Sequence, residues 1–368
     1  MPAKKTTAPA LRIRSLSARA LAAPLRRQVT TASGAVTKAP MVLIDLLTEE
    51  GIRGSSYLFL PSPPALKPMV ELLRGISPVI AGQAVAPQAI ETALRKKFLL
   101  LGGTGLVTAA IAGIDMACWD ALGKALGLPL ALLWGGERRP IPAYNSTGLG
   151  LMGAKPAAKE AEALLEFGFR HIKLRLGYPT LEEDVAVTRA VKKAVGPGVT
   201  VMGDFNQCLS TAEAIRRGNA LDDEGLYWIE EPIRADDYAG NAAIARELKT
   251  LVQIGENFWS TQDAEKALAA GACDLIMPDA MKIGGATAWL RAASLAEARG
   301  VPISSHLFAE FSAHLLSVAP TAHFLEYVDW ANPFLQEPLA IKDGHATAPV
   351  RAGSGMEWDE KAVKKFLL

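Results

Sequence analysis

The fold of this chain is decided by three short apolar stretches, which are TVMGDFN (200–206), LYWIEEP (226–232) and LVQIGEN (251–257). Each stretch carries a carboxylate near its end, namely Asp204, Glu230 and Glu256, and 26 positions separate each neighbouring pair. A strand with its following helix takes roughly 25–35 residues, so the carboxylates repeat once per strand–helix unit. This repeat predicts a parallel barrel with all three side chains on one rim.

The three carboxylates also predict a metal site. Oxygen donors without Cys or His suit a hard divalent cation, and Mg²⁺ is the expected one. A single acid at a strand end is commonly a solvated loop residue, and that alternative stays open for each acid taken alone. Three acids in register favour the metal site.

Length, charge and cysteine usage indicate a large soluble enzyme. The 368 residues suffice for a barrel of about 250 residues and a second domain, and 50% of them are hydrophobic. The formal charge is +1 and the chain has no basic stripe, so we expect no nucleic-acid partner. No apolar run approaches the roughly 20 residues that span a bilayer, so we expect no membrane partner. The cysteines, Cys118, Cys208 and Cys273, are odd in number and scattered, which fits a reducing, cytoplasmic compartment.

The sequence pattern changes near Pro140. Before it, strand-like pieces (LRIRSLSARAL, MVLIDLLTEEG, RGSSYLFL) precede helical segments, which predicts an α+β domain. The almost wholly apolar stretch TGLVTAAIAGIDMACWDALGKALG predicts a buried helix. After Pro140, eight strand candidates alternate with helical segments and predict a (β/α) barrel. The candidates are IPAYNS, HIKLRLG, TVMGDFN, LYWIEEP, LVQIGEN, DLIMPDA, VPISSH and HFLEY.

More polar residues lie at the ends of these strands. Lys173 and Arg175 are two apart on one strand, so both point to the same side. Asp279 and His306 end adjacent strands, where the acid can orient the imidazole and raise its basicity. Glu326 ends the last strand. A lone His at a strand end is usually structural, but an Asp one unit upstream favours a catalytic pair.

The chain resembles the mandelate racemase subgroup of the enolase superfamily over nearly its whole length. The motifs that carry the resemblance are IDMACWDALGK, IKLRLGYP, MGDFNQ, WIEEP, QIGEN, MPDAMKIGGAT and SSHLF. The resemblance implies an α/β fold in which an α+β capping domain covers a modified (β/α)₇β barrel of the TIM type. We expect a basic tail and first strand over 1–27, the capping domain over 28–140, and the barrel over 141–330. The segment 331–368 is expected to return to the capping domain.

The resemblance also implies roles for the site residues. Asp204, Glu230 and Glu256 match the Mg²⁺ ligands, and Asp279 with His306 matches the catalytic pair. Lys173 matches a lysine that neutralises the substrate carboxylate, and Glu326 matches an acid that hydrogen-bonds it. Removing a proton α to a carboxylate makes a dianionic enolate, so we expect a metal ion, the lysine and a protonated carboxyl group around its oxygens. Glu231 is expected to point away and to be structural.

Arg175 is the main departure from the family pattern, which has Lys-x-Lys where this chain has Lys-x-Arg. Deprotonating an arginine side chain at pH 7 costs about 8 kcal/mol, against about 5 kcal/mol for a lysine. Arg175 can act as the second base of a racemase, or only bind substrate while His306 performs one-sided chemistry such as β-dehydration. The third alternative is an impaired barrel with another role.

The predicted substrate pocket is mostly apolar. Val29, Thr31, Val36 and Phe59 match positions that form an apolar pocket in the subgroup, whereas Ser33 and Pro61 depart from it. The residues expected to bind substrate are Val29, Thr31, Val36, Phe59, Ser146 and Asn206. The sequence therefore predicts a Mg²⁺-dependent racemase of mandelate-type 2-hydroxy acids, acting on a small carboxylate and forming a homo-oligomer. The alternatives are an acid-sugar dehydratase of the same superfamily and a carboxylate-binding or structural homologue.

Overall fold

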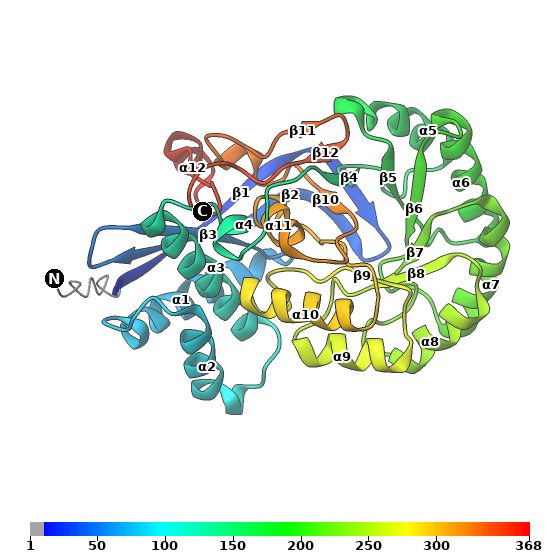
Figure 1. Ribbon diagram of the computed structural model, residues 1–368. Coiled ribbons are helices and arrows are strands. Elements are labelled where there is room, and N and C mark those ends of the chain that lie inside the picture. The colour runs from blue at the N-terminus through cyan, green and yellow to red at the C-terminus, as the bar shows by residue number, and fades with distance from the viewer. Residues whose placement is uncertain (1–10) are drawn as a thin grey trace.

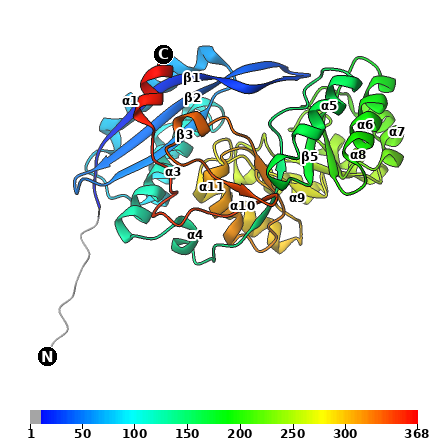
Figure 2. The ribbon, with the colours of Figure 1, turned by 90° about the horizontal axis from the view of Figure 1, so that it is seen from above.

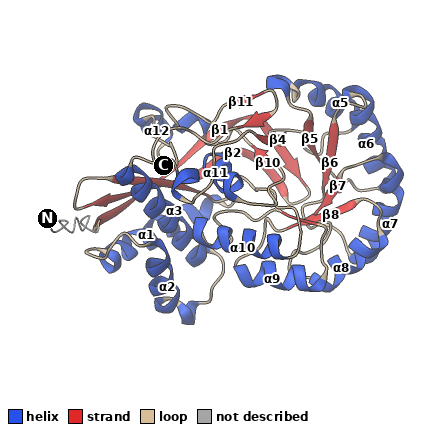
Figure 3. Ribbon diagram, in the orientation of Figure 1, coloured by secondary structure: helices blue, strands red, loops and turns tan. Residues whose placement is uncertain are grey.

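The computed structural model describes residues 11–368 and consists of an antiparallel sheet with helices packed against a parallel barrel (Figure 1). Of the predicted basic tail and first strand (1–27), residues 1–10 lie outside the described residues and residues 13–27 form part of a long strand. Helices surround the barrel strands, and the antiparallel sheet covers one side of the barrel (Figure 3). The α/β fold with a capping domain is therefore confirmed.

The capping sheet has the order β1 (Ile13–Thr31), β2 (Gly34–Thr48) and β3 (Arg53–Phe59). β1 runs through position 27, where the sequence analysis had divided the tail from the cap. The first two strands also continue beyond the predicted strand pieces, and residues 26–40 form the tip of the β1–β2 hairpin. The register between these strands shifts between Pro24 and Val29. Figure 2 shows this hairpin extending over the barrel toward α5.

Three helices complete the cap: α1 (Leu66–Ile80), α2 (Pro87–Lys97) and α3 (Leu106–Leu126). α3 is the predicted buried helix, and it packs directly on β2 and β3. Gly54 lets the α3 backbone approach β3, and Gly113 leaves room for the side chains of Ile44 and Leu58. By length and mean hydropathy alone α3 could cross a membrane, but 78% of its most apolar window is buried inside the fold. α3 is therefore the core helix of the cap.

The barrel strands and helices alternate along the chain. The strands are β4 (Ile141–Asn145), β5 (His171–Arg175), β6 (Thr200–Asp204), β7 (Trp228–Glu230), β8 (Leu251–Ile254), β9 (Leu275–Ile276) and β10 (Leu325–Tyr327). The helices are α5 (Ala154–Ala163), α6 (Leu181–Val195), α7 (Thr211–Leu221), α8 (Tyr238–Glu247), α9 (Thr261–Ala270), α10 (Ala286–Ala298) and α11 (Ala309–Val318). Neighbouring strands are parallel, and β10 pairs with β4, which closes the ring.

The predicted strand VPISSH is not a continuous strand. Ile303 makes isolated bridges to Ile276 and Ala322, and His306 makes one to Asp279. Pro302 has no N–H to donate, and the residues after it form hydrogen bonds alternately to the segment at β9 and to the segment that leads into β10. Ser304 N–H donates to the Ile276 carbonyl and Ser305 N–H to the Phe324 carbonyl, so the segment still fills a strand's place.

The shorter elements connect these parts. They are the helices α4 (Leu130–Leu133) and α12 (Glu360–Phe366), the strands β11 (Ile341–Lys342) and β12 (His345–Ala346), and the 3₁₀ turns η1 (Pro63–Ala65), η2 (Leu99–Leu101), η3 (Glu166–Gly168), η4 (Asp222–Glu224) and η5 (Asn332–Phe334). The last segment contacts both parts of the molecule. β12 pairs with β4, and α12 lies against β1, where Arg19 forms an ion pair with Glu360.

Candidate active site

The parallel register brings the three predicted metal-binding carboxylates to one rim. Asp204 is paired with Arg175 on one side and with Glu230 on the other, so their side chains lie at the same level of the barrel. Asp204, Glu230 and Glu256 each offer an oxygen, and these oxygens lie within 4.8 Å of one another. Asp204 and Glu230 are fully buried and Glu256 is nearly so. The geometry is that of a site that can hold one small cation.

Lys173 lies beneath this cluster and contacts three acids. Its Nζ is 2.6 Å from Glu230 Oε1, 2.8 Å from Glu326 Oε1 and 3.3 Å from Asp204 Oδ2. Burial alone would lower the pKa of Lys173, but the surrounding carboxylates raise it above its ordinary value. Lys173 is therefore a fixed ammonium ion.

The charge balance of the rim favours a divalent cation. Buried or nearly buried carboxylates at Asp204, Glu230, Glu256, Asp279 and Glu326 outnumber the lysine and arginine cations, Lys173, Arg175 and Lys282, by five to three. Burial raises the pKa of Glu230 well above its ordinary value, because a buried carboxylate prefers to be neutral. A hard divalent ion among all-oxygen donors offsets this excess, so the residues fit Mg²⁺.

The predicted pair of Asp279 and His306 forms a direct contact. His306 Nδ1 lies 2.7 Å from Asp279 Oδ2, while Asp279 Oδ1 accepts the backbone N–H groups of Met281 and Lys282 at 2.8 Å each. The carboxylate is thus fixed in orientation, and His306 Nε2 faces the cluster, 3.1 Å from Glu256 Oε2. Burial would lower the pKa of His306, but Glu256, Glu326 and Asp279 raise it well above its ordinary value.

Glu326 lies between Lys173 and the backbone that follows His306. Burial would raise its pKa, but the neighbouring Lys173 and His306 lower it to about 2. Its Oε2 accepts the backbone N–H of Leu307 at 3.0 Å, which supports the left-handed backbone of that residue. Glu326 therefore holds Lys173 and the chain after His306. Its expected role as a protonated acid that hydrogen-bonds the substrate carboxylate stays a prediction.

Arg175 is held at its tip by the loop after β4. Its Nη1 donates to the carbonyls of Ser146 and Gly148 at 3.4 and 3.3 Å, and its Nη2 donates to the Ser146 hydroxyl at 3.0 Å. Its buried Nε has no hydrogen-bond partner among the described residues and lies 3.9 Å from Asp204 Oδ2. The guanidinium plane is therefore fixed, and its Nε–H makes no hydrogen bond with a described residue.

These groups share a cavity of about 150 Å³ at the cap–barrel junction. Of the predicted substrate-binding residues, Val29, Thr31, Val36, Phe59 and Asn206 line it. Ser146 does not line it and instead holds Arg175. Sequence reasoning missed four apolar lining residues, which are Met281, Leu307, Val328 and Trp330. Trp330 packs against Phe59 with ring centroids 4.8 Å apart, a contact between segments distant in sequence that no local pattern could reveal.

A hydrogen-bonded chain lies behind the metal-binding residues. Glu231, which was expected to be structural, accepts Asn257 Nδ2 at 2.6 Å. Asn257 also donates to Glu256 at 3.0 Å and accepts from Lys282 Nζ at 2.6 Å. Sequence reasoning did not single out Asn257 or Lys282, although both stand in the quoted motifs QIGEN and MPDAMKIGGAT. The chain fixes the orientation of Glu256.

The β1–β2 hairpin is anchored to the barrel next to the cavity. Arg26 and Arg27 form ion pairs with Glu166 at 3.1 Å. The backbone N–H of Leu151 donates to the Thr30 carbonyl at 2.7 Å, and Gly150 permits this approach because a side chain there would meet the Thr30 backbone. The hairpin thereby forms one wall of the cavity.

Comparisons with known proteins agree with this geometry. Residues 15–135 match the mandelate racemase/muconate lactonizing enzyme N-terminal domain, and residues 156–362 match the enolase C-terminal domain-like family. A 3,6-anhydro-alpha-L-galactonate cycloisomerase from Streptomyces coelicolor is 32% identical over 91% of this chain and 94% of its own length. An L-talarate/galactarate dehydratase from Salmonella typhimurium is 34% identical over 71% of this chain and 66% of its own length.

A solved structure is more similar still. An enolase from Bradyrhizobium, complexed with magnesium and mandelic acid, is 44% identical, covers 98% of this chain and 99% of its own, and superposes with a TM-score of 0.94. From its capping sheet to the carboxylates on its barrel rim, this chain belongs to the mandelate racemase/muconate lactonizing enzyme family of the enolase superfamily.

Proposed function

We propose that this chain catalyses the Mg²⁺-dependent removal of the α-proton from a 2-hydroxy carboxylate with an apolar α-substituent, with racemisation as the net reaction. The observation that carries the proposal is the mixed lining of the cavity. The lining includes the charged groups of Lys173, Arg175, Glu256 and His306 together with apolar side chains such as Val36 and Trp330. A molecule with a carboxylate at one end and an apolar group at the other fits both kinds of lining.

The apolar part of the lining supports an aryl or alkyl substituent over a polyol. Val29, Val36, Phe59, Val328 and Trp330 offer no hydrogen-bonding group to sugar hydroxyls except the Trp330 indole N–H. Each hydroxyl that loses water without gaining a partner weakens binding, by about 1–3 kcal/mol on protein scales. The Bradyrhizobium relative, crystallised with mandelic acid, gives independent support for this substrate class.

The chain's own residues provide the proton transfer. In its neutral form His306 takes the α-proton on Nε2, the electrons of the C–H bond move toward the carboxylate, and Asp279 stabilises the resulting imidazolium through Nδ1. Lys173 keeps a positive charge beside the carboxylate oxygens as negative charge grows on them. When bound at the three rim carboxylates, Mg²⁺ supplies further electrophilic stabilisation of those oxygens. Return of a proton to the opposite face, from Arg175, completes racemisation.

A second candidate, β-dehydration with His306 acting alone, is favoured by the attachment of Arg175. Two carbonyls and a hydroxyl hold its guanidinium as a hydrogen-bond donor, which suits a permanent cation better than a base. The dehydratases among the relatives support the same candidate.

An exchange experiment in D₂O separates the two candidates. The Mg²⁺-loaded protein is mixed with each enantiomer of mandelate, with alkyl 2-hydroxy acids and with acid sugars, and the products are followed by NMR and polarimetry. Deuterium at the α-carbon with loss of optical rotation supports the racemase. A 2-keto-3-deoxy product from an acid sugar supports the dehydratase, and no exchange with any 2-hydroxy acid contradicts the proposal.

A further inference from the structure

The two residues that follow His306 have a left-handed backbone. Leu307 and Phe308 have φ angles of 49° and 47°, and α11 begins at the next residue. A left-handed backbone is uncommon for residues with a bulky side chain, and it persists only where surrounding contacts hold it. The position of His306 therefore depends on the contacts that hold these two residues, which we call the 307–308 turn.

Two barrel residues hold the backbone of the 307–308 turn. Glu326 accepts the N–H of Leu307 at 3.0 Å, and the Ser312 hydroxyl donates to the Leu307 carbonyl at 2.9 Å. The Ser312 N–H also donates to the Phe308 carbonyl at 2.8 Å. These hydrogen bonds act on the main chain alone, so the buried ring of Phe308 is held by other residues.

Tyr57 of the cap contacts this turn and the helix that follows it. Its ring stacks on the ring of Phe308, with centroids 4.9 Å apart and an angle of 27° between the planes. Its hydroxyl donates to Oε2 of Glu310, in the first turn of α11, at 2.8 Å. All three side chains are buried. One residue of β3 therefore holds both the 307–308 turn and the start of α11.

Glu310 has no cation to balance its charge. In the described part of the chain, no side chain other than Tyr57 hydrogen-bonds its carboxylate, and no lysine or arginine forms an ion pair with it. Burial raises the pKa of Glu310, whereas the hydrogen bond from Tyr57 lowers it. A carboxylate here therefore relies on Tyr57 and on the amino-terminal end of α11. Neither residue is among those that line the substrate cavity, so their effect on the reaction must pass through other residues.

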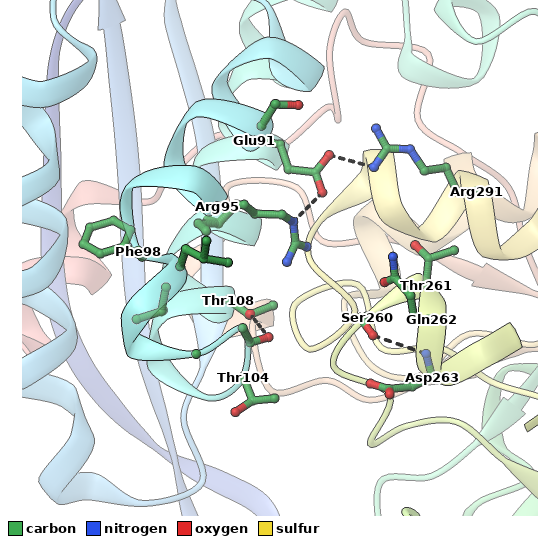
Figure 4. Close-up of a pocket in the computed structure, with 16 residues that line it drawn as sticks. Glu91, Arg95, Phe98, Thr104, Thr108, Ser260, Thr261, Gln262, Asp263 and Arg291 are labelled. Atoms are coloured by element: carbon green, nitrogen blue, oxygen red, sulfur yellow. Dashed lines mark hydrogen bonds and ion pairs between the residues drawn. The ribbon is translucent and has the colours of Figure 1, made fainter. Parts of the chain in front are cut away.

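The cap is joined firmly to the barrel, so Tyr57 is a fixed support. β3 packs on α3, and Asp115 of α3 accepts a backbone N–H at the start of α10 at 3.0 Å. Figure 4 shows a second joint, where Arg95 of the cap and Arg291 of α10 both reach toward the buried Glu91, each at 2.8 Å. These contacts keep the cap helices, and with them β3, in place against the barrel.

We propose that Tyr57, through Phe308 and Glu310, is a positioning residue that holds the imidazole of His306 in line with Asp279. The proposal rests on the proposed function of this chain, in which His306 takes the α-proton. His306 is then supported on two sides, by Asp279 at Nδ1 and by the 307–308 turn at its backbone. Proton transfer depends steeply on the distance and alignment of the base, so a displaced turn lowers the rate. The cap thus contributes to the chemistry as well as to the wall of the cavity.

Tyr57→Phe tests the proposal, because it removes the hydroxyl and keeps the stacked ring. We expect kcat for α-proton exchange from the enantiomer served by His306 to fall about tenfold, which is the effect of one hydrogen bond expressed as a rate. KM and the Mg²⁺ affinity should stay at their wild-type values. Tyr227→Phe is the matched control, since it removes a hydroxyl that contacts His323 at 3.0 Å at the opposite end of the barrel, and it should leave kcat unchanged.

A double-mutant cycle tests the route through Glu310. Glu310→Gln keeps an oxygen that accepts the hydrogen bond from Tyr57 and should keep kcat near the wild-type value, whereas Glu310→Ala should lose about as much as Tyr57→Phe. The double variant Tyr57→Phe/Glu310→Ala should lose no more than either single variant, because the same contact is removed in all three. Losses that multiply in the double variant would overturn the proposal that the two residues act together.

A spectroscopic test needs no substrate. In protein labelled with ¹⁵N-histidine, the proton on His306 Nδ1 that bonds to Asp279 gives a low-field NMR signal, which is assigned by its absence from His306→Asn. We expect this signal to shift in Tyr57→Phe and to stay unchanged in Tyr227→Phe.

The combined results decide the role of Tyr57. A wild-type signal and a wild-type kcat in Tyr57→Phe would overturn the proposal, and so would an equal loss of kcat in Tyr227→Phe or a raised KM with unchanged kcat. If the wild type exchanges no 2-hydroxy acid, the proposed function fails by itself. The signal of Tyr57→Phe then decides the positioning of His306 alone, since a shift supports it and an unchanged signal overturns it.

Discussion

The orientation of Asp279 makes the substitution Asp279→Asn a sharp test of the proposed base. Oδ1 of this residue accepts two backbone N–H groups, so an asparagine must place its carbonyl oxygen there. Its amide nitrogen then takes the Oδ2 position, 2.7 Å from His306 Nδ1, and donates a hydrogen to it. His306 is left with its proton on Nε2, the atom that faces the cavity, and the imidazole can no longer accept the α-proton.

Two losses set the size of the effect. The charge-assisted hydrogen bond between Asp279 and His306 contributes about 1.5–3 kcal/mol, which is roughly 10-fold to 150-fold in rate. Reversing the tautomer removes general-base catalysis, which contributes about 10²-fold to 10⁴-fold. Since the two losses overlap, we expect deuterium exchange from the enantiomer served by His306 to fall by about 10³-fold. Exchange from the other enantiomer, which begins at Arg175, should continue.

The assay is α-proton exchange in D₂O, followed by NMR for each enantiomer separately with saturating Mg²⁺. Asp274→Asn is the matched control, because Asp274 accepts the Val252 N–H at the opposite end of the barrel and an asparagine keeps that bond. Wild-type exchange by Asp279→Asn from both enantiomers would refute the role of His306. Equal loss from both enantiomers, with weakened Mg²⁺ binding, would show that the substitution damaged the metal site instead.

Three further predictions follow from the structure. Chelation should abolish exchange, and added Mg²⁺ should restore it. Glu230→Gln should weaken Mg²⁺ binding measured by calorimetry, because one of three anionic donors becomes neutral. Full activity after complete demetallation would contradict the metal requirement. If Arg175 is the second base, Arg175→Lys should retain or raise the racemisation rate, since a lysine costs about 3 kcal/mol less to deprotonate than an arginine. Arg175→Met should stop exchange from one face only, and a changed KM with unchanged kcat would mark Arg175 as a substrate-binding cation. Burial lowers the pKa of His314 to about 4. The neutral imidazole therefore contributes about 3 kcal/mol to the stability of the fold above pH 6.5, and this contribution is lost as the pH falls through 4. Urea unfolding at pH 7 and pH 4 should therefore show the stability gap between wild type and His314→Asn narrowing on acidification, and a constant gap would exclude this role.

The sequence predicted those parts of the fold and site that repeat along the chain. The equal spacing of Asp204, Glu230 and Glu256 predicted that their side chains would meet, because each strand–helix unit advances the chain by one position around the barrel. Helices with one apolar face, such as α6, could be placed from their period. α11 could not be singled out, because nearly all of its side chains are buried and the pattern has no polar face. Trp330 and the anchoring of Arg175 by Ser146 depend on contacts between distant segments, which no local pattern records.

The cavity residues on the anchored β1–β2 hairpin lie on a different part of the chain from the residues proposed to transfer the proton. The residues proposed to transfer the proton come from strand ends of the barrel, whereas Val29, Thr31 and Val36 come from a hairpin held to the barrel by a few surface contacts. A substitution in the hairpin changes the shape of the cavity without moving Asp279 or His306. A descendant of this protein could therefore acquire a new substrate through changes in one short segment, with its proton-transfer machinery inherited intact.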